Sequence, residues 1–497
     1  MVLAKPAEQT PLIAHRAVEL MHEAGIPRAA LQFLPGRGEV VGAGLCSDAR
    51  VKGVIFTGST EVAQLINRTL AKRAAAEGAD IPLIAETGGQ NAMIVDSSAL
   101  PEQVVQDAIS SAFDSAGQRC SALRVLFLQE DIADKTIKML KGAMGELNIG
   151  NPDRLVTDIG PVIDNEAQQN LLNHIETMKK SAVDHFSLNV PLAAAGTYVP
   201  PTVLEIRSLD ELSKEVFGPV MHVIRYKRAD LGKIVEQINA SGYGLTLGVH
   251  SRIDETIDFI TARAHVGNIY INRNIVGAVV GVQPFGGEGK SGTGPKAGGP
   301  LYLKRLQRGA VTPAQHARLA TPALDALEVW AKGKGRERVV SLADQYAHST
   351  ALGSTIELPG PTGERNTLSF APRGHVVCLA ESADVLLNQI AAVLATGNQA
   401  VVVSKSLPAD LPAAALDQIK QANNLSSIDC SFQVALVESA LAPGVREQLA
   451  ARDGALVAVI DTSADEAIPL WRLVAERALC VNTTAAGGNA SLMTLSA

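Results

Sequence analysis

A cysteine flanked by arginines is the residue of this chain whose type and surroundings best suit a nucleophile. Cys120 lies in the stretch AGQRCSALR, where its neighbours are small or polar and where Arg119 and Arg124 would favour the thiolate. A free cysteine is more often a small buried hydrophobe than a nucleophile, so that alternative stays open. The helical run before Cys120 predicts that it lies in a turn rather than on a packed helix face.

An acid at the end of an apolar run is a second candidate for chemistry. Glu86 ends the run IPLIAE and is followed by TGG. A carboxylate there is costly to bury without a partner, so its pKa would rise and suit a general base. The alternative is a carboxylate that caps the strand and its turn, and the residues alone favour neither reading.

Two short motifs near the N-terminus could bind a dinucleotide. FTGSTE places Gly58 and Ser59 between a strand and a helix N-terminus, an arrangement that binds phosphate through backbone N–H groups. KPAEQT places Lys5 and Glu8 at a strand end, where they could bind ribose hydroxyls and where the carboxylate would favour NAD over NADP. The alternative for both motifs is a solvated loop.

The elements that must position these residues alternate between strand and helix patterns. Residues 1–90 contain strands MVLAK, LQFLPG and VKGVIFTGS and a helix that begins at Thr10 and Pro11 and ends at Gly25. This alternation predicts βαβ units and a parallel sheet. Because the chain opens inside a strand, we expect it to be cut within its first domain.

Residues 91 to about 300 and 351–497 predict two further α/β units, joined by a charged helical region. An internal echo links them: CVNTTAAGG can be laid on YINRNIVGA, so that Asn482 meets Asn272 and Gly487 meets Gly277. VVVSK, ending at Lys405, can likewise be laid on MVLAK. Together these matches suggest a degenerate second copy of the fold.

Composition narrows the class of protein. The chain has 497 residues, a net charge of -7 and no basic tract, so roughly three domains are expected and a nucleic-acid partner is not. No apolar run reaches the length of about 18 residues that a membrane span needs. The cysteines are odd in number and far apart, which predicts neither a disulfide framework nor a metal site and fits a reducing, cytoplasmic location.

The chemical motifs occur in a fixed order: KPAEQT, FTGSTE, ETGGQN, GQRCSA, EVFGP and PFGGEGKSG. This order resembles the aldehyde dehydrogenase superfamily over residues 1–305. The resemblance implies an α/β aldehyde dehydrogenase fold, with a partial Rossmann-like NAD-binding domain at residues 1–87 and a catalytic domain at residues 88–305. It also implies oxidation of an aldehyde by NAD through a cysteine thioester.

The resemblance carries roles onto individual residues. Cys120 is implied as the nucleophile, and Glu86 as the base that activates the water that hydrolyses the thioester. The implied cofactor contacts are Lys5 and Glu8 at the adenosine ribose, Gly58 and Ser59 at the pyrophosphate, and Glu215 and Phe217 at the nicotinamide half.

A narrower resemblance concerns the loop NRNIVGAVVGVQPFGGEGKSGTGPKAGGPLYL, which is similar to the anchor loop of L-glutamate γ-semialdehyde (pyrroline-5-carboxylate) dehydrogenases. It implies that Gly277, Ala278 and Ser121 bind the α-carboxylate of that substrate, because a Gly-Ala turn presents unhindered N–H groups. Phe113 and Phe285 are implied to flank its aliphatic stem, and plain packing is the alternative for both rings.

The overall layout resembles the C-terminal part of the proline utilization A family. This implies a helical linker at residues 306–350 and a non-catalytic, degenerate domain at 351–497 that acts as a lid or assembly element. It also implies a homo-oligomer, a dimer by expectation, and an upstream proline dehydrogenase domain that holds FAD, so no flavin is expected in this chain. Cys378, Cys430 and Cys480 are predicted to be structural.

One departure from the family and two alternatives complete the prediction. Family members carry an asparagine before the KPAEQT block that binds the oxyanion, and this sequence begins after it; loss of such a donor costs about 10²–10³ in rate. The alternatives are a dehydrogenase of another carboxylated aldehyde, such as succinate semialdehyde, and a non-catalytic fragment or assembly module.

Overall fold

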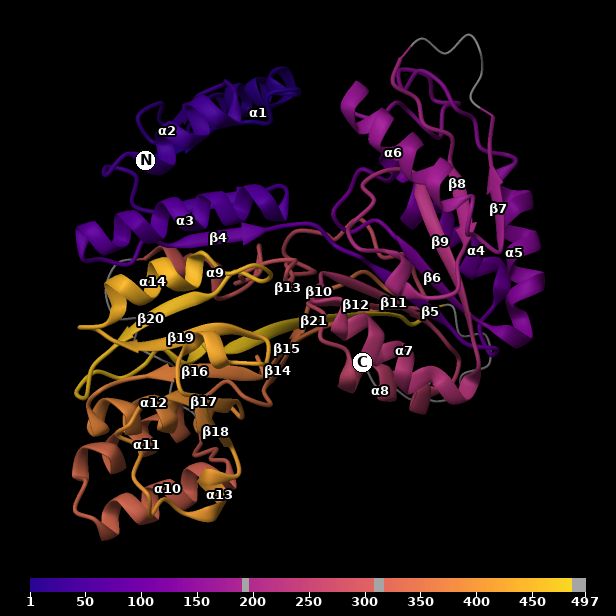
Figure 1. Ribbon diagram of the computed structural model, residues 1–497. Helices are drawn as coiled ribbons and strands as arrows, with labels where there is room; N and C mark the ends of the chain where they lie inside the picture. The colour runs from indigo at the N-terminus through magenta and orange to yellow at the C-terminus, as the bar shows by residue number, and fades with distance from the viewer. Residues whose placement is uncertain (190–195, 308–316, 485–497) are drawn as a thin grey trace.

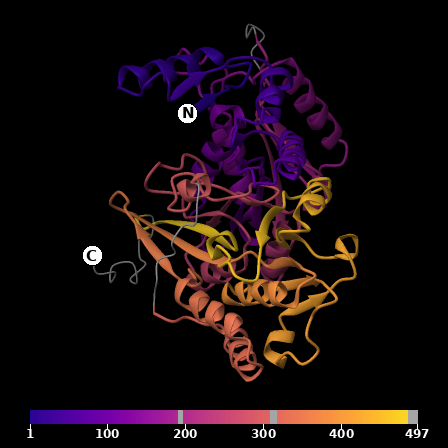
Figure 2. The same ribbon diagram turned by 90° about the vertical axis from the view of Figure 1, so that its left-hand side faces the viewer.

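The structure is a computed structural model that describes residues 1–189, 196–307 and 317–484. Figure 1 shows an N-terminal segment, a large sheet with its helices, and a smaller C-terminal sheet with helices of its own. In Figure 2 the indigo N-terminal segment and the orange helices of residues 322–349 lie at opposite ends of the molecule.

The N-terminal segment forms the predicted elements but not one sheet. Strands β1 (Val2–Ala4) and β2 (Leu31–Phe33) pair in parallel, and β3 (Val54–Thr57) pairs in parallel with β4 (Leu83–Glu86). A short π-helix and α2 (Ala43–Ser47) occupy the chain between β2 and β3, so the expected continuous sheet is split into two pairs. The helices α1 (Pro11–Glu23) and α3 (Thr60–Glu77) match the sequence prediction, with Pro11 at the first position of α1.

A ten-stranded sheet holds the centre of the molecule, in the order β14-β15-β21-β12-β11-β5-β6-β9-β8-β7. Its central strands, in the order β12-β11-β5-β6, pair in parallel and are buried along their whole length, as is typical of parallel sheets covered on both faces. The strands are β5 (Ala92–Val95), β6 (Val125–Gln129), β7 (Asp184–Ser187), β8 (Thr202–Glu205), β9 (Val220–Tyr226), β11 (Thr246–His250), β12 (Asn268–Ile271), β14 (Thr355–Leu358), β15 (Glu364–Pro372) and β21 (Val474–Asn482).

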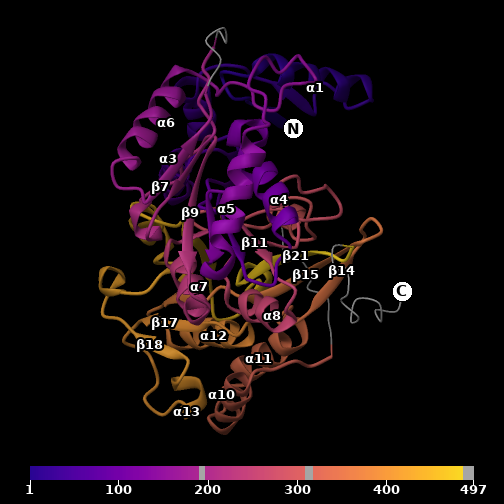
Figure 3. The same cartoon turned by 90° about the vertical axis from the view of Figure 1, so that its right-hand side faces the viewer.

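Helices cover this sheet on both sides. Figures 1 and 3 show α4 and α5 on one side and α7 and α8 on the other. The packed side chains form the largest core cluster of the described residues. The helices are α4 (Pro101–Phe113), α5 (Glu130–Met144), α6 (Asn165–Met178), α7 (Leu231–Ala240), α8 (Asp254–Arg263) and the short α9 (Tyr302–Leu306).

The C-terminal unit is a five-stranded parallel sheet in the order β18-β17-β16-β19-β20. Its strands are β16 (His375–Leu379), β17 (Gln399–Val403), β18 (Ile419–Gln421), β19 (Phe432–Glu438) and β20 (Ala458–Thr462). Its helices are α10 (Pro322–Gly333), α11 (Glu337–Ser349), α12 (Ala383–Ala395), α13 (Ala413–Leu416) and α14 (Ala442–Ala450). Side chains of α10 and α11 share one core with α12, so the region expected as a linker packs as part of this unit.

The two segments of the predicted repeat that contain Tyr270 and Cys480 pair with each other as neighbouring strands. Strand β21 lies parallel to β12, with Cys480 directly opposite Tyr270, and the Asn482 amide donates a hydrogen bond to the Asn272 carbonyl at 3.1 Å. Three strands of residues 351–497, namely β14, β15 and β21, therefore extend the large sheet rather than the C-terminal one. Residues 485–488 of this segment, including Gly487, lie outside the described residues.

The described ranges contain neither a candidate membrane span nor a candidate metal cluster. No helix there is both long and apolar enough to cross a membrane. No group of three or more His, Cys, Asp or Glu side chains in those ranges is arranged to hold a metal ion.

Candidate active site

Cys120 lies in the turn that the sequence predicts, after α4 and a short 3₁₀ segment (Asp114–Gly117). Ser115, Ala116 and Gly117 adopt left-handed backbone angles in succession, with φ of 56°, 54° and 66°. Such angles cost non-glycine residues about 1–3 kcal/mol each, so surrounding contacts must hold this backbone. A Cβ on Gly117 would lie 2.2 Å from the Gly218 carbonyl oxygen, so only glycine fits there.

A buried amide holds the turn from the other side. Asn91 Nδ2 donates to the Cys120 carbonyl at 2.7 Å and to the Ala122 carbonyl at 2.8 Å, while its Oδ1 accepts the Thr246 N–H at 3.1 Å. Sequence reasoning missed Asn91, although it follows Glu86 within the block ETGGQN. The amide joins β5, the cysteine turn and β11, and so fixes where Cys120 lies.

The predicted effect of the two arginines on Cys120 is wrong. Burial raises the pKa of the Cys120 thiol, and the nearby Glu86 and Glu215 carboxylates raise that pKa further. The Arg124 guanidinium is buried, pairs with Glu215 at 3.3 Å and donates to backbone carbonyls, while Arg119 donates to a serine hydroxyl. Arg124 is therefore committed to holding the turn and the Glu215 carboxylate.

Glu86 closes β4 beside this turn. Its Oε2 accepts the Gly287 N–H at 2.9 Å, whereas its buried Oε1 has no hydrogen-bond partner among the described residues. Burial raises the pKa of Glu86 to about 8, against the opposing effect of the Gly287 N–H. A Cβ on Gly286 or Gly292 would lie 2.8 or 2.9 Å from Oε1, so the glycines of the loop leave room for the carboxylate.

A buried lysine and a distant glutamate also border Glu86. Lys296 Nζ donates to Asn268 Oδ1 at 2.8 Å and to the Gly286 carbonyl, and burial lowers the pKa of Lys296 to about 8. The backbone N–H of Lys296 donates to Glu476 Oε2 at 2.7 Å. Sequence reasoning missed both, because Glu476 comes from β21, far along the chain.

The residues predicted to bind the adenosine end lie together. Glu8 Oε2 accepts the Gly38 N–H at 2.8 Å, and a Cβ on Gly38 would lie 4.0 Å from Lys5 Nζ. Ser59 caps α3 by accepting the Val62 N–H at 3.2 Å, directly after Gly58. The side chains of Lys5 and Glu8 thus both lie near Gly38, and the turn before α3 has the form that binds phosphate.

The residues predicted for the nicotinamide half lie between this turn and Cys120. The Glu215 pKa is raised, chiefly by burial and also by the nearby charge of Glu61 in the first turn of α3. A Cβ on Gly88 would lie 2.1 Å from Glu215 Oε2, so Gly88 makes space for that carboxylate. Phe217 is 45% exposed, and its ring centroid lies 5.3 Å from the Arg124 guanidinium. The set fits a dinucleotide laid from Ser59 towards Cys120.

The predicted substrate residues come from three places. Ser121 is buried next to Cys120, and its carbonyl accepts the Thr246 hydroxyl at 3.2 Å. Gly277 has a left-handed φ of 77°, is exposed, and precedes the half-buried Ala278. Phe113 is fully buried in the main core, whereas Phe285 is half-buried and its backbone pairs with Ala297.

The loop that contains Gly277 is held by β15 and β21, the strands that the chain after residue 350 adds to the large sheet. Gln283 Nε2 donates to Glu364 Oε1 at 2.7 Å and contacts Cys480 Sγ at 3.3 Å, and Arg273 forms an ion pair with Glu364. Glu364 lies on β15 and Cys480 on β21, so both come from the strands that extend the large sheet.

This chain is similar to several known proteins. A profile described as "Aldehyde dehydrogenase family" matches residues 1–308. The chain is 54% identical over 523 aligned residues to the "Bifunctional protein PutA" of Escherichia coli strain K12, covering 99% of this chain and 40% of that protein. It thus spans about two fifths of the length of that relative.

Two shorter relatives match the first part of the chain. The "1-pyrroline-5-carboxylate dehydrogenase" of Geobacillus kaustophilus is 38% identical over 304 residues, which cover 61% of this chain and 58% of that protein. A crystal structure of "1-Pyrroline-5-Carboxylate Dehydrogenase from Thermus with bound NAD" is 36% identical, with a TM-score of 0.57, and covers 61% of this chain and 59% of the other.

Proposed function

We propose that this chain, which belongs to the aldehyde dehydrogenase family, oxidises L-glutamate γ-semialdehyde to L-glutamate with NAD. The observation that carries the proposal is the position of the Glu86 carboxylate near Cys120, where it raises the pKa of the thiol. They come from β4 and from the turn after α4.

Cys120 supplies the nucleophile in this proposal. Its sulfur attacks the aldehyde carbon, and the left-handed turn held by Asn91 and Arg124 keeps that sulfur in one position. Because the thiol pKa is raised, a base must take its proton. The Glu86 carboxylate suits that task, since its own pKa of about 8 lies near the operating pH.

Once Glu86 has released the thiol proton to solvent, its carboxylate acts a second time, on water. After oxidation the acyl group is held on Cys120 as a thioester, and the Glu86 carboxylate removes a proton from the water that attacks it. Its Oε1, which lacks a partner among the described residues, is the oxygen free to accept that proton. The products are the free thiol and the γ-carboxylate of glutamate.

NAD, when bound, accepts the hydride that the aldehyde carbon loses. Lys5 and Glu8 would hold the adenosine ribose, Gly58 and Ser59 the pyrophosphate. Glu215 and Phe217 would hold the nicotinamide half, and Gly88 supports the fit because its missing side chain makes space for the Glu215 carboxylate.

The substrate class rests on the anchor loop. Gly277, Ala278 and Ser121 would bind the α-carboxylate of the semialdehyde, with Phe113 and Phe285 beside its stem. Gly277 supports this assignment because its left-handed, exposed backbone can present N–H groups to an anion. The printed names of the two shorter relatives also point to this substrate class.

A specificity measurement tests the proposal. NADH production would be followed with L-glutamate γ-semialdehyde and with succinate semialdehyde, and kcat/KM compared. We expect a clear preference for the glutamate compound, because only it carries the α-amine and α-carboxylate. Equal or reversed values would leave the dehydrogenase and overturn the substrate. Absence of both turnover and NAD binding in a titration would favour the non-catalytic module.

The wider assignments belong to the same proposal. We propose a cytoplasmic homodimer whose parent carries a proline dehydrogenase domain with FAD upstream of this chain. The word "bifunctional" in the name of the Escherichia coli relative, and the share of that relative that the chain spans, support the upstream domain. Proline oxidation by an extended parent would test it.

A further inference from the structure

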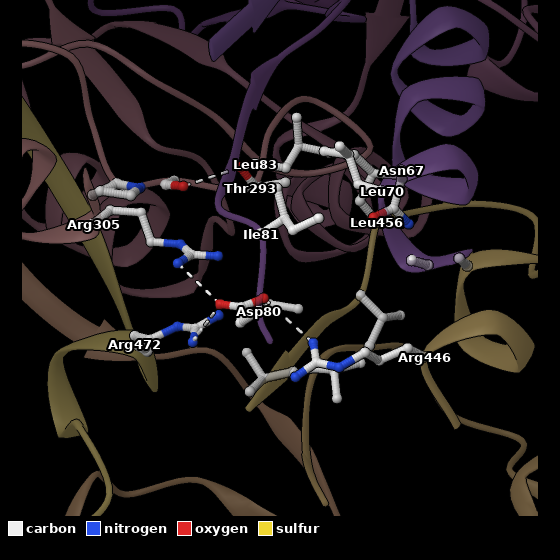
Figure 4. A pocket seen from close by; sticks show the side chains of 18 of the residues that line it. Asn67, Leu70, Asp80, Ile81, Leu83, Thr293, Arg305, Arg446, Leu456 and Arg472 are labelled. Carbon is white, nitrogen blue, oxygen red and sulfur yellow. Dashed lines mark hydrogen bonds and ion pairs between the residues drawn. The ribbon is translucent and has the colours of Figure 1, made fainter. Parts of the chain in front are cut away.

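A cavity of about 90 Å³ lies where three parts of the chain meet, and neither Cys120 nor Glu86 lines it. Helix α3 and the loop before β4 form one wall, the segment from Thr293 to Arg305 a second, and the C-terminal unit a third. Figure 4 shows Asp80 at the centre of its charged side, with Arg305 and Arg472 to one side of it and Arg446 to the other.

These guanidinium groups share one carboxylate. Asp80 lies 3.1 Å from Arg305, 3.3 Å from Arg446 and 3.7 Å from Arg472, and the three arginine side chains are only 8–14% exposed. Arg446 also pairs with Asp461, which does not line the cavity. Burial and the neighbouring guanidinium groups lower the pKa of Arg472 to about 9, as expected where positive charge is in excess.

A fourth guanidinium lines the cavity without an ion-pair partner. Arg373, which follows β15, has no carboxylate within ion-pair distance among the described residues, and Nη2 reaches the Thr293 carbonyl only at 3.5 Å. Its buried Nε has no hydrogen-bond partner in those residues. Glu476, the other lining carboxylate, accepts the Lys296 N–H. A buried guanidinium left in this way is costly, and a bound anion removes the cost.

We propose that this cavity binds a compact oxyanion, namely phosphate or a phosphoryl group. Four guanidinium groups and two carboxylates line it, so the lining itself carries a surplus of positive charge. Guanidinium forks match the oxygens of a phosphate in pairs. A volume of about 90 Å³ exceeds the roughly 10–15 Å³ that one water needs by the same measure, so the cavity has room for a tetrahedral ion.

The site would join the three parts of the chain. Arg305 belongs to the end of the large-sheet unit, Arg446 to α14, and Asp80 to the loop that leads into β4. Apolar side chains of α3 and of the C-terminal unit, including Leu70 and Leu456, also line the cavity. An anion held there ties the C-terminal unit to the N-terminal segment.

Calorimetric titration with inorganic phosphate, at constant ionic strength against chloride, tests the proposal. We expect saturable binding to one site per chain, which Arg373→Met weakens by about ten- to hundredfold, because it removes a charged hydrogen-bond donor. Arg365→Met is the matched control, since Arg365 is exposed on β15, and it should bind phosphate as the unaltered chain does.

A second variant keeps the test decisive if Arg373→Met fails to fold. Asp80→Asn removes the competing carboxylate, so it should bind phosphate several-fold more tightly and gain more thermal stability from it.

AMP carries the same phosphoryl group on a nucleoside. If AMP competes with phosphate and Arg373→Met weakens that competition, the ligand is a nucleotide. If AMP does not compete, the ligand is the free ion. Unchanged affinity in Arg373→Met would place the anion elsewhere, such as the Gly58–Ser59 turn. That result, no saturable binding, or weaker binding by Asp80→Asn overturns the proposal.

Discussion

The unit built on the ten-stranded sheet and the unit built on the five-stranded sheet use the same alternation of strands and helices, yet each treats its cysteine differently. Cys378 lies in the middle of β16, fully buried, and burial alone raises its pKa. Cys120 lies in a turn with left-handed backbone and has Glu86 within electrostatic reach. The left-handed turn and the neighbouring acid, rather than the sheet, therefore make a cysteine a candidate nucleophile.

The chain after residue 350 nevertheless contributes to that site. It adds β15 and β21 to the ten-stranded sheet, and these strands carry Glu364 against the anchor loop and Glu476 against Lys296. Cys120 thus lies in the ten-stranded unit and Glu86 on β4, while β15 and β21 hold the loops around them. Four changes, taken from the largest expected effect to the smallest, would break or sharpen this division.

Cys120→Ala should have the largest effect. Loss of the nucleophile should lower the rate of NADH production by about 10⁴-fold or more. Cys378→Ala is the matched control and should leave kcat within a few-fold, because that thiol contacts no candidate site residue. Comparable losses in both variants would erase the distinction between the two units.

Glu86→Gln should slow both halves of the reaction. Steady-state kcat should fall by about 10²–10⁴-fold, and the first turnover of NADH should slow as well, because the same carboxylate takes the thiol proton. In the unaltered enzyme kcat should rise with pH through about 8, because only the carboxylate accepts a proton from water. A pH profile without that rise, or an equal loss in the exposed variant Glu447→Gln, would argue against this role.

Glu364→Ala tests whether the Glu364 side chain on β15 holds the anchor loop that contains Gly277. Arg273 and Gln283 lose their shared carboxylate, so the loop should loosen and kcat/KM for the semialdehyde should fall by about ten- to hundredfold, mostly through KM. The exposed Glu357 on β14 provides the control Glu357→Ala. An unchanged KM would show that backbone pairing of β21 with β12 suffices.

Lys296→Met should have the smallest effect, because it should shift the pH dependence of kcat without abolishing activity. The Lys296 cation lowers the pKa of Glu86, so its removal should raise that pKa and move the rise of kcat to higher pH by about half a unit to one unit. Lys72→Met, on the exposed side of α3, should leave the profile in place. A shift to lower pH would reverse the assigned sign.

Local patterns in the sequence were enough for most elements and for the candidate residues. Proline at the start of α1, apolar runs at β4 and β6, and the glycine-serine turn before α3 act within a few residues, so the sequence shows them directly. The order of the motifs identified Cys120 and Glu86, and the profile match over residues 1–308 confirms the family that this order indicated.

Tertiary structure alone decided what depends on distant residues. The effect of Arg119 and Arg124 on the thiol could not be read from their positions beside Cys120, because Arg124 turns to Glu215 and to backbone carbonyls. Glu476 meets Lys296 only after β21 pairs with β12. Local sequence determined which groups are present and the elements that carry them, whereas burial and pairing between distant strands decided their charges and neighbours.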